Sequence, residues 1–459
     1  MKSLFGTDGI RGTAGVFPLD ERTVTRVGAA LARTLMHHAA TGPPRIVIGR
    51  DTRESGEWIE AALAAGASMN GVTCSAVGVV PTPGIAWMAR TGGFAAGVMI
   101  SASHNPYRDN GIKVFSASGY KLPDEEEIAI ERLVLDEGTP PLLPETAAAS
   151  SRKGVPGAPD HLLDGYAEFL REAVSPGVRF DGMRVVLDCA NGASCALAPS
   201  VFAALGADVV AIFDTPDGHN INSGCGSLHP DRLAATVKER GADVGIAFDG
   251  DADRTLFVSA DGQVADGDVL IYQAARYLKK RGQLPGDLVV TTVMSNLWLE
   301  RSLAEVGIRM ARTQVGDKYV LQEMVRSGAV LGGEQSGHII FADRATTGDG
   351  IMTALRLMEV LRANDDTVTG WLSQVRAFPQ ILLNIPVASR PDLMNHPVIG
   401  TTAARVVNEL GGDGRLVLRY SGTEPLARVM IEGTDKEQVE TLARDLAGVI
   451  DQEIGARGE

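Results

Sequence analysis

Arg184-Val-Val-Leu-Asp188 begins the segment that decides the fold class of this chain. An amphipathic stretch follows to about Leu205, and Gly206 then leads into a second apolar run, Asp208-Val-Val-Ala-Ile-Phe213. The pattern predicts a strand, a helix that ends near the glycine, and a second strand. Because crossovers of this kind are right-handed, they predict a mainly parallel sheet covered by helices.

The same pattern occurs twice more, each time with a glycine near the helix end. An earlier copy runs from Arg45-Ile-Val-Ile-Gly49 to Val72-Thr-Cys-Ser-Ala-Val77. A later copy runs from Asp287-Leu-Val-Val-Thr291 to Ile308-Arg-Met-Ala-Arg312. Internal repeats of this type indicate an α/β protein with three related domains and mixed, mainly parallel sheets.

The length of the chain, a cluster of prolines and a change of pattern predict where these domains end. With 459 residues the chain is too long for one core. Prolines cluster between Asp136 and Asp160 and indicate a linker. After about Gly370 the pattern changes to alternating strands and a final helix, which indicates a smaller α+β domain. The predicted domains are residues 1–153, 154–255, 256–369 and 370–459.

Composition excludes several partners. The formal net charge of −14 argues against nucleic acid or an anionic membrane surface as the main partner, because both require basic protein surfaces. The four cysteines form no CxxC pair and are too few to cross-link the chain, and the first residues lack the apolar core of a signal peptide. We therefore expect a cytoplasmic protein.

Gly245-Ile-Ala-Phe-Asp-Gly-Asp-Ala-Asp-Arg254 places three carboxylates at alternate positions after an apolar run. Three crowded negative charges are costly unless a cation neutralises them, and oxygen ligands suit Mg²⁺ or Ca²⁺. An EF-hand loop would require Gly and Glu where this chain has Arg254 and Ala260. A solvated acidic turn is the other alternative. Arg254 argues against that alternative, since a cation beside three carboxylates indicates an anionic ligand as well.

Four further segments carry reactive groups in polar turns. Ser101-Ala-Ser-His-Asn-Pro106 follows an apolar run and is a candidate nucleophile loop, although chemistry alone does not choose between Ser101 and Ser103. Leu331-Gly-Gly-Glu-Gln-Ser-Gly-His338 has groups that suit a polyhydroxylated substrate. Arg419-Tyr-Ser-Gly-Thr-Glu-Pro425, with Arg428, has the donors that hold a phosphate dianion. Phe5-Gly-Thr-Asp-Gly-Ile-Arg-Gly12 is a weaker candidate for contact with an anion. Each segment could also be an ordinary polar turn.

Taken together, Ser101–Pro106, Asp249–Arg254, Gly333–His338 and Arg419–Pro425 resemble, in order and spacing, the four signature loops of the α-D-phosphohexomutases. The resemblance covers essentially the whole chain. It implies four domains around a central cleft, three of them related α/β units, and an intramolecular phosphotransferase that acts on a phosphosugar.

The resemblance also implies roles for individual residues. The implied metal ligands, for Mg²⁺, are a phosphate oxygen on phosphorylated Ser103 and the carboxylates of Asp249, Asp251 and Asp253. The other implied catalytic residues are Arg11, Lys113, Arg254 and His338, with either Lys113 or His338 moving the hydroxyl proton. The implied substrate-binding residues are Lys318, Glu334, Gln335, Ser336, Arg419, Ser421, Gly422, Thr423 and Arg428.

Within the family, the chain is most similar to the branch that interconverts glucosamine 6-phosphate and glucosamine 1-phosphate. This rests on Phe5–Gly12, on Cys225-Gly-Ser-Leu-His-Pro230 and above all on Gln335, where the mannose and glucose branch usually carries Met. Tyr420 and Lys318 depart from the commonest residues of the branch. The resemblance further implies a 1,6-bisphosphate intermediate, activation by glucosamine or glucose 1,6-bisphosphate, and a homodimer. A mannose or glucose phosphate mutase and a non-catalytic phosphosugar sensor are the alternatives. A serine hydrolase is less well supported, because no GxSxG motif is present.

Overall fold

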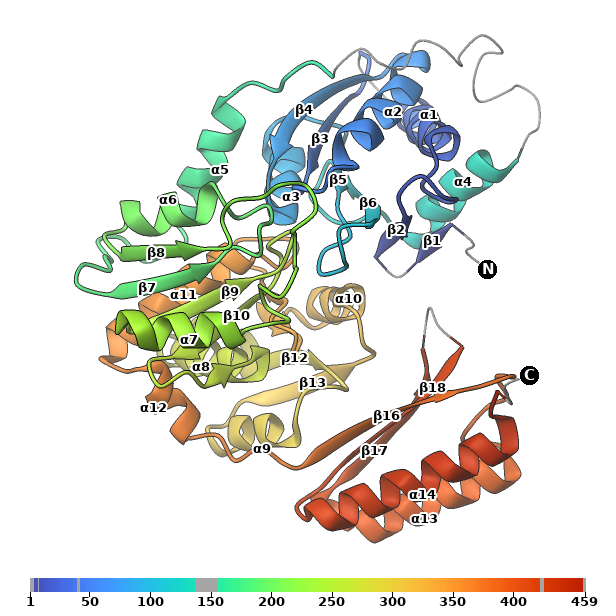
Figure 1. Ribbon diagram of the computed structural model, residues 1–459, viewed down its shortest axis with the longest axis vertical. Coiled ribbons are helices and arrows are strands. Elements are labelled where there is room, and N and C mark those ends of the chain that lie inside the picture. The colour runs from blue at the N-terminus through green and yellow to red at the C-terminus, as the bar shows by residue number, and fades with distance from the viewer. Residues whose placement is uncertain (1–3, 7, 39–41, 137–154, 422–424, 457–459) are drawn as a thin grey trace.

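The computed structural model of the chain describes residues 4–6, 8–38, 42–136, 155–421 and 425–456. Figure 1 shows four units in chain order, each with a sheet and with helices packed against it. Among the described helices, none is both long enough and apolar enough to cross a membrane. Most of the predicted linker, residues 137–154, lies outside the described residues.

The first unit is a six-stranded sheet in the order β1-β2-β6-β5-β3-β4. β3 pairs in parallel with β4 and with β5, and the remaining pairs are antiparallel. Its strands are β1 (Phe5–Gly6), β2 (Gly9–Thr13), β3 (Arg45–Arg50), β4 (Thr73–Val79), β5 (Ala96–Ile100) and β6 (Asp109–Ser116). Its helices are α1 (Glu21–His38), α2 (Gly56–Met69), α3 (Thr82–Thr91) and α4 (Asp124–Leu135).

The second unit is a five-stranded sheet in the order β11-β10-β9-β7-β8. β7 pairs in parallel with β8 and β9, and β10 pairs antiparallel with β9 and β11. Its strands are β7 (Arg184–Asp188), β8 (Asp208–Ile212), β9 (Val244–Phe248), β10 (Thr255–Ser259) and β11 (Val264–Ala265). The helices in this part of the chain are α5 (His161–Arg171), α6 (Leu197–Ala204) and α7 (Asp231–Arg240).

The third unit is a four-stranded sheet in the order β13-β12-β14-β15, with β12 parallel to β13 and β14, and with β15 antiparallel to β14. The strands are β12 (Leu288–Thr292), β13 (Arg309–Thr313), β14 (Leu331–Gly333) and β15 (Ile339–Phe341). The helices are α8 (Gly267–Lys280), α9 (Leu297–Glu305), α10 (Asp317–Ser327), α11 (Gly350–Asn364) and α12 (Val368–Ser373), with a short 3₁₀ turn at Pro285–Asp287.

The fourth unit is smaller, with an antiparallel sheet in the order β16-β18-β17. Its strands are β16 (Gln380–Pro386), β17 (Arg415–Tyr420) and β18 (Leu426–Glu432). The helices α13 (Pro397–Leu410) and α14 (Lys436–Ile454) lie side by side on one face of this sheet, and a 3₁₀ turn covers Gly411–Asp413 (Figure 1). The smaller C-terminal α+β domain predicted from the sequence is confirmed.

The three predicted repeats are also confirmed. Each forms a strand, a helix and a second strand that pairs in parallel with the first, with Arg45 opposite Thr73, Arg184 opposite Asp208, and Leu288 opposite Arg309. The glycine after each helix has a positive φ, as it must where the chain leaves a helix and reverses toward the sheet: 78° at Gly71, 95° at Gly206 and 70° at Gly307.

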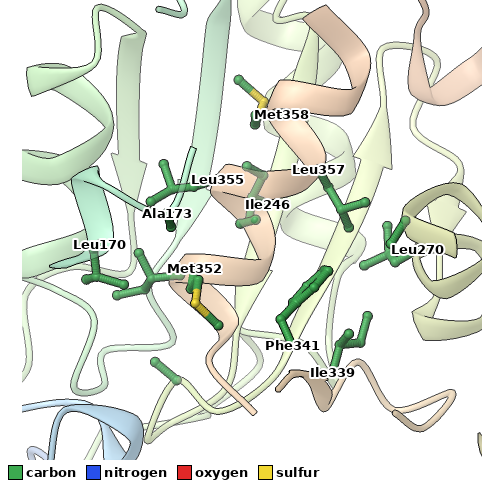
Figure 2. Packing of buried hydrophobic residues seen from close by; sticks show 14 of the residues in the cluster. Leu170, Ala173, Ile246, Leu270, Ile339, Phe341, Met352, Leu355, Leu357 and Met358 are labelled. Atoms are coloured by element: carbon green, nitrogen blue, oxygen red, sulfur yellow. The ribbon is translucent and has the colours of Figure 1, made fainter. Parts of the chain in front are cut away.

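The largest apolar core joins the first, second and third units. Figure 2 shows Met352, Leu355, Leu357 and Met358 of α11 among side chains from α5, β9, α8 and β15, all from a single cluster of buried residues. Apolar burial of this extent is the dominant favourable term in holding units together. Loops at the ends of β9 and β14 are therefore carried by units that share one core.

Candidate active site

The loop after β5 brings Ser103 to the segment Asp249–Arg254, which we call the metal loop. Ser103 is 1% exposed, has φ of 53°, and donates a hydrogen bond from Oγ to Asp249 Oδ2 at 2.6 Å. Ser101 Oγ instead accepts from Ser103 N at 2.9 Å and donates to Asp51 Oδ2 at 2.6 Å. The geometry therefore separates the two candidates: Ser103 faces the carboxylates, and Ser101 holds the loop.

Asp249, Asp251 and Asp253 follow β9 and are all buried, with a carboxylate oxygen of each within 4.8 Å of the others. Burial, together with the charges of Asp253 and Asp251, raises the pKa of Asp249 well above its ordinary value. Oδ1 of Asp251 and Oδ1 of Asp253 make no hydrogen bond to the described residues. Three converging carboxylates with unused oxygens are a donor set that fits a hard divalent cation.

Lys113 is a buried cation beside this cluster. Its Nζ lies 2.8 Å from Asp251 Oδ2, 3.2 Å from Asp8 Oδ2 and 3.5 Å from Asp253 Oδ2, and the side chain is 1% exposed. Burial alone would lower the pKa of Lys113, but these carboxylates raise it above its ordinary value. Lys113 is therefore a buried cation among carboxylates and not a surface lysine with its head in water.

Arg254 and Arg11 supply two further guanidiniums. Arg254 Nε is 3.8 Å from Asp253 Oδ1 and 4.0 Å from Asp249 Oδ2, and Arg11 forms an ion pair with Asp8. The Nε atoms of both arginines are buried and make no hydrogen bond to the described residues. Buried donors of this kind are costly unless a ligand satisfies them, which indicates an anion at this place.

Several residues at the site escaped the sequence analysis. Asp8 contacts Lys113, Arg11 and Lys121, and those three cations hold the pKa of Asp8 well below its ordinary value although burial alone would raise it. Lys121 also pairs with Asp317, at the start of α10, so it joins the first unit to the third. Thr82 Oγ1 donates to Asp251 Oδ2 at 2.5 Å. Asp8 lies in the segment Phe5–Gly12, so the sequence could have identified it. The contacts of Lys121 and Thr82 join distant segments, and no local pattern predicts them.

The loop between β14 and β15 carries the residues expected to bind sugar. Glu334 Oε1 accepts a hydrogen bond from Gly316 N at 3.0 Å, and Gln335 Nε2 donates to Asp266 Oδ2 at 3.0 Å. Ser336, at the tip of the loop, is exposed. The contact with Asp266, the N-cap of α8, fixes the orientation of the Gln335 amide and directs its nitrogen toward Asp266.

His338 connects this loop to the metal loop. It is 3% exposed, its Nδ1 lies 3.6 Å from Asp253 Oδ2, and its Nε2 accepts from Gly348 N at 3.1 Å. Burial lowers the pKa of His338, but the charges of Asp253, Asp317 and Glu334 raise it above its ordinary value. The structure therefore brings both candidate proton carriers, Lys113 and His338, to one shared carboxylate, that of Asp253.

The fourth unit carries two arginines on neighbouring strands. Arg419 of β17 lies opposite Arg428 of β18, and Arg428 Nη2 donates to Ser421 Oγ at 3.3 Å. Burial and the charge of Arg428 lower the pKa of Arg419. Like charges at directly opposed positions are destabilising, so the pair suits an anion between them. Gly422 and Thr423 lie outside the described residues.

Lys318 lies at the start of α10. Its Nζ forms an ion pair with Asp124 Oδ2 at the start of α4, and so it connects the third unit to the first. Lys318 and Asp317 are adjacent in α10 and both pair with residues of the first unit, Asp124 and Lys121. The start of α10 is therefore held against the first unit by two ion pairs.

The chain matches the models of four domains that together make up one known architecture. They are described as phosphoglucomutase/phosphomannomutase α/β/α domain I, over residues 2–140, α/β/α domain II, over 164–262, α/β/α domain III, over 266–378, and the C-terminal domain, over 382–449. The chain belongs to the phosphoglucomutase/phosphomannomutase family, the phosphohexomutases. The predicted family resemblance and fold class are confirmed.

Similar proteins within this family are named more narrowly. The chain is 50% identical to a phosphoglucosamine mutase of Solibacter usitatus, over 99% of each chain, and 46% identical to a phosphoglucosamine mutase of Koribacter versatilis, over 99% of this chain and 98% of the other. Among solved structures, a phosphoglucomutase/phosphomannomutase family protein of Burkholderia thailandensis has a TM-score of 0.77 at 26% identity, over 99% of this chain and 100% of the other.

A more distant structure has the same fold. The N-acetylphosphoglucosamine mutase of Aspergillus fumigatus, in complex with GlcNAc-6P and magnesium, has a TM-score of 0.68 at 18% identity and covers 98% of this chain and 96% of the other. At that identity the comparison concerns the architecture of the chain. It agrees with the four units described above.

Proposed function

We propose that this chain interconverts glucosamine 6-phosphate and glucosamine 1-phosphate through a phosphoserine at Ser103 and a 1,6-bisphosphate intermediate. The observation that carries the proposal is the contact of 2.6 Å between Ser103 Oγ and Asp249 in a buried cluster of three carboxylates. The names of relatives that are 43–50% identical over nearly the whole chain support the amino sugar as substrate. Gln335 supports the same choice.

The first transfer would proceed from phosphorylated Ser103 to the C1 hydroxyl of the bound 6-phosphosugar. The bond from phosphorus to Ser103 Oγ breaks and a bond to the sugar oxygen forms, while the hydroxyl proton leaves the sugar and Ser103 Oγ regains a proton. Lys113 and His338 both stay candidates for moving that proton. Mg²⁺, held by Asp249, Asp251, Asp253 and a phosphate oxygen, would offset charge on the phosphoryl group.

The second transfer returns a phosphoryl group to Ser103. The 1,6-bisphosphate turns around without leaving, its 6-phosphate passes to Ser103 Oγ, and the 1-phosphosugar is released. Glu334, Gln335 and Ser336 would contact the sugar. Arg419, Ser421, Gly422, Thr423 and Arg428 would hold whichever phosphate is not reacting, with Lys318 contributing from the start of α10. Escape of the bisphosphate would leave an inactive, dephosphorylated enzyme, so the site must close during the turn.

The test is an assay of sugar preference. Phosphorylated enzyme is given glucosamine 6-phosphate with Mg²⁺ and a catalytic amount of glucosamine or glucose 1,6-bisphosphate, and mannose and glucose 6-phosphates are assayed in parallel. We expect kcat/KM to be highest for the amino sugar. A preference for mannose or glucose phosphate would keep the mechanism and replace the substrate, whereas no turnover of any of them would favour a phosphosugar sensor.

We further propose a cytoplasmic location and a homodimer, and we expect neither nucleic acid nor membrane as a partner. The net charge of −14 and the four scattered cysteines support the location and the absence of polyanionic partners. Gel filtration with light scattering would measure the oligomeric state directly.

A further inference from the structure

We propose that Arg53 and Asn222 are positioning residues for phosphoryl transfer, because together they hold the backbone of the Ser103 loop against the metal loop. Arg53 comes from the first unit and Asn222 from the second. The inference rests on the proposed function, in which Ser103 must meet a metal bound by Asp249, Asp251 and Asp253.

Arg53 is an arginine with no exposed side-chain surface in a loop after β3. Its Nη2 donates to Ser103 O at 3.0 Å and to Asn105 O at 2.8 Å, and its Nη1 donates to Asp109 O at 2.9 Å and also to Pro106 O. Nε completes the set by donating to Asp51 Oδ2 at 2.9 Å. A planar guanidinium with five donors is the side chain best able to fix several carbonyl groups at once.

Asn222 reaches the same two carbonyl groups from the second unit. Its Nδ2 lies 2.9 Å from Ser103 O and 3.1 Å from Asn105 O. Carbonyl oxygens only accept hydrogen bonds, so the amide nitrogen, not the amide oxygen, must face them. Each of the two carbonyl groups therefore receives one donor from the first unit and one from the second.

The metal loop packs directly against this junction. A Cβ atom on Gly250, between Asp249 and Asp251, would lie 2.5 Å from Ser103 O and 2.8 Å from Asn222 Nδ2. Only glycine leaves room for the Ser103 carbonyl at this distance. The position of that carbonyl consequently sets the position of the Ser103 hydroxyl relative to the metal ligands.

The conformation of Ser103 needs such support. Its φ of 53° lies in the left-handed region, which is unfavourable for a serine and persists only when the surroundings fix it. Four hydrogen bonds to the Ser103 and Asn105 carbonyls supply that constraint. Their function in the reaction is alignment, since phosphoryl transfer depends mainly on positioning and electrostatics.

Asn222 is the better residue to test, because removal of Arg53 would leave Asp51 unpaired in the interior and would unfold the loop. Asn222 itself has φ of 57°, so Asn222→Gly removes both donors and keeps a backbone that glycine adopts without strain. Asn222→Asp is a second variant of the same size, which replaces the donors with acceptors that repel the two carbonyl oxygens.

The measurement is a single turnover, in which phosphate passes from phosphorylated enzyme to saturating sugar phosphate. We expect the transfer rate to fall about 10- to 100-fold in Asn222→Gly and at least as far in Asn222→Asp, because small misplacements of reacting groups have effects of that size. The KM for the sugar phosphate should stay within about threefold of the wild-type value, since the contacts to the sugar are unchanged. An unchanged transfer rate, even with a lowered melting temperature, would overturn the proposal.

Asn220→Ala is the matched control. Asn220 lies in the same loop, but its side chain donates to Thr215 O at 3.0 Å and accepts from Asp217 N at 3.1 Å, so its hydrogen bonds stay within the loop. The control should transfer phosphate at a rate within about twofold of wild type, because surface substitutions away from the reacting groups have small effects. A control as slow as Asn222→Gly would overturn the assignment to Asn222.

Metal binding gives a readout that does not depend on turnover. Titration with Mg²⁺ should show weaker binding by the phosphorylated Asn222→Gly variant and unchanged binding by its unphosphorylated form. Only the phosphorylated form binds Mg²⁺ through ligands from both the Ser103 loop and the metal loop, whose relative position Asn222 would maintain. Equal weakening of both forms would overturn the proposal. A wild type that turns over mannose phosphate and not glucosamine phosphate would replace the proposed substrate, and the same titration would still decide the role of Asn222.

Discussion

Two loops of this protein are proposed to hold phosphate, and they are built differently. The Ser103 loop is buried, and hydrogen bonds from two units fix its carbonyl groups. The second region has Arg419 of β17 opposite Arg428 of β18, where Arg419 Nη1 donates to Tyr420 O and Arg428 Nη2 donates to Ser421 Oγ, both at 3.3 Å. The first region has its backbone carbonyl groups fixed by side chains from two units, whereas the second brings two cations together on neighbouring strands.

The difference follows from what each loop would do. Transfer of a phosphoryl group requires the reacting atoms in one geometry, so the donor loop gains from being fixed. The other loop would hold the phosphate of a sugar that presents itself in two orientations, so it gains from adaptable side chains. Rigidity at one site and adaptability at the other are both needed if the bisphosphate turns around in place.

The end of the fourth-unit sheet that lies near the third unit is held by an ion pair. Glu432 has no exposed side-chain surface; its Oε2 pairs with Arg415 Nε at 2.6 Å and its Oε1 accepts from Leu297 N at 2.7 Å. Arg415 Nη1 donates to Val293 O at 2.8 Å, so the pair also reaches the strand end before α9. The contacts of Arg415 and Glu432 therefore tie one end of β17 and β18 to the third unit, and Arg419 and Arg428 lie toward the other end of these strands (Figure 1).

The largest effect should come from the fixed loop. Ser103→Ala removes the oxygen that would carry phosphate, and we expect mutase turnover to be abolished because no other described hydroxyl replaces the contact of Ser103 Oγ with Asp249. Binding of glucosamine 6-phosphate, measured by calorimetric titration, should be retained, since Ala fills the same space and the sugar contacts remain. Normal turnover by this variant would refute the nucleophile assignment. Ser101→Ala is the companion variant. It keeps the Ser103 hydroxyl but removes a hydrogen bond that holds the loop, so it should retain part of the wild-type activity.

A smaller and different effect is expected from the arginine pair on β17 and β18. Arg419→Ala should mainly raise KM, by about tenfold or more, because a charge-assisted hydrogen bond contributes roughly 1.5–3 kcal/mol and this one is made in ground state and transition state alike. Steady-state kinetics with glucosamine 6-phosphate would measure it. Arg405→Ala is the control, because Arg405 lies on α13 of the same unit and pairs with Glu409 and Asp445 at the surface. A large fall in kcat at unchanged KM would show that the two loops do not divide the work in this way.

The contrast between the loops also explains how much the sequence reveals. Hydrophobic runs, helix-ending glycines and carboxylates at alternate positions are local patterns, so the three repeats and the metal loop can be predicted from neighbouring residues. Gln335 and the serine loop likewise stand in short motifs. The domain limits at 153, 255 and 369 stay predictions, because linkers and strand ends carry weaker signals than strands do.

What the sequence does not reveal are contacts between distant segments. No local pattern in the sequence marks Arg53, yet its side chain is buried and bonds to carbonyl groups some fifty positions away. The ion pair of Lys318 with Asp124 likewise joins segments far apart in the sequence, and the role of Lys318 at the sugar phosphate stays a prediction. Tertiary packing decides such partners, and no local spacing records it.

The connection between the third and fourth units contains a buried titratable group, Asp268. Asp268, on the first turn of α8, has no exposed surface, and its Oδ2 accepts a hydrogen bond from Asn296 N at 2.7 Å. Asn296 in turn binds Phe378 just before β16, so Asp268 supports the connection to the fourth unit. Burial, followed by the charge of Asp266, raises the pKa of Asp268 to about 8.

The smallest effect should therefore be one on stability that depends on pH. Because folding raises this pKa from 3.8 to about 8, the stability that Asp268 contributes is fully present below about pH 4 and is lost as the pH rises through about 8. Asp268→Asn cannot ionise and keeps an oxygen for Asn296 N, so its unfolding free energy should exceed that of wild type by about 1–3 kcal/mol at pH 9 and by less at pH 5. Calorimetric melting across this range would measure the difference, with Asp365→Asn, at an exposed turn, as control. If the unfolding free energies of wild type and Asp268→Asn change with pH in parallel, Asp268 does not contribute to the pH dependence of stability. A raised KM in the variant at pH 9 would show that the connection between the third and fourth units affects how Arg419 meets the substrate.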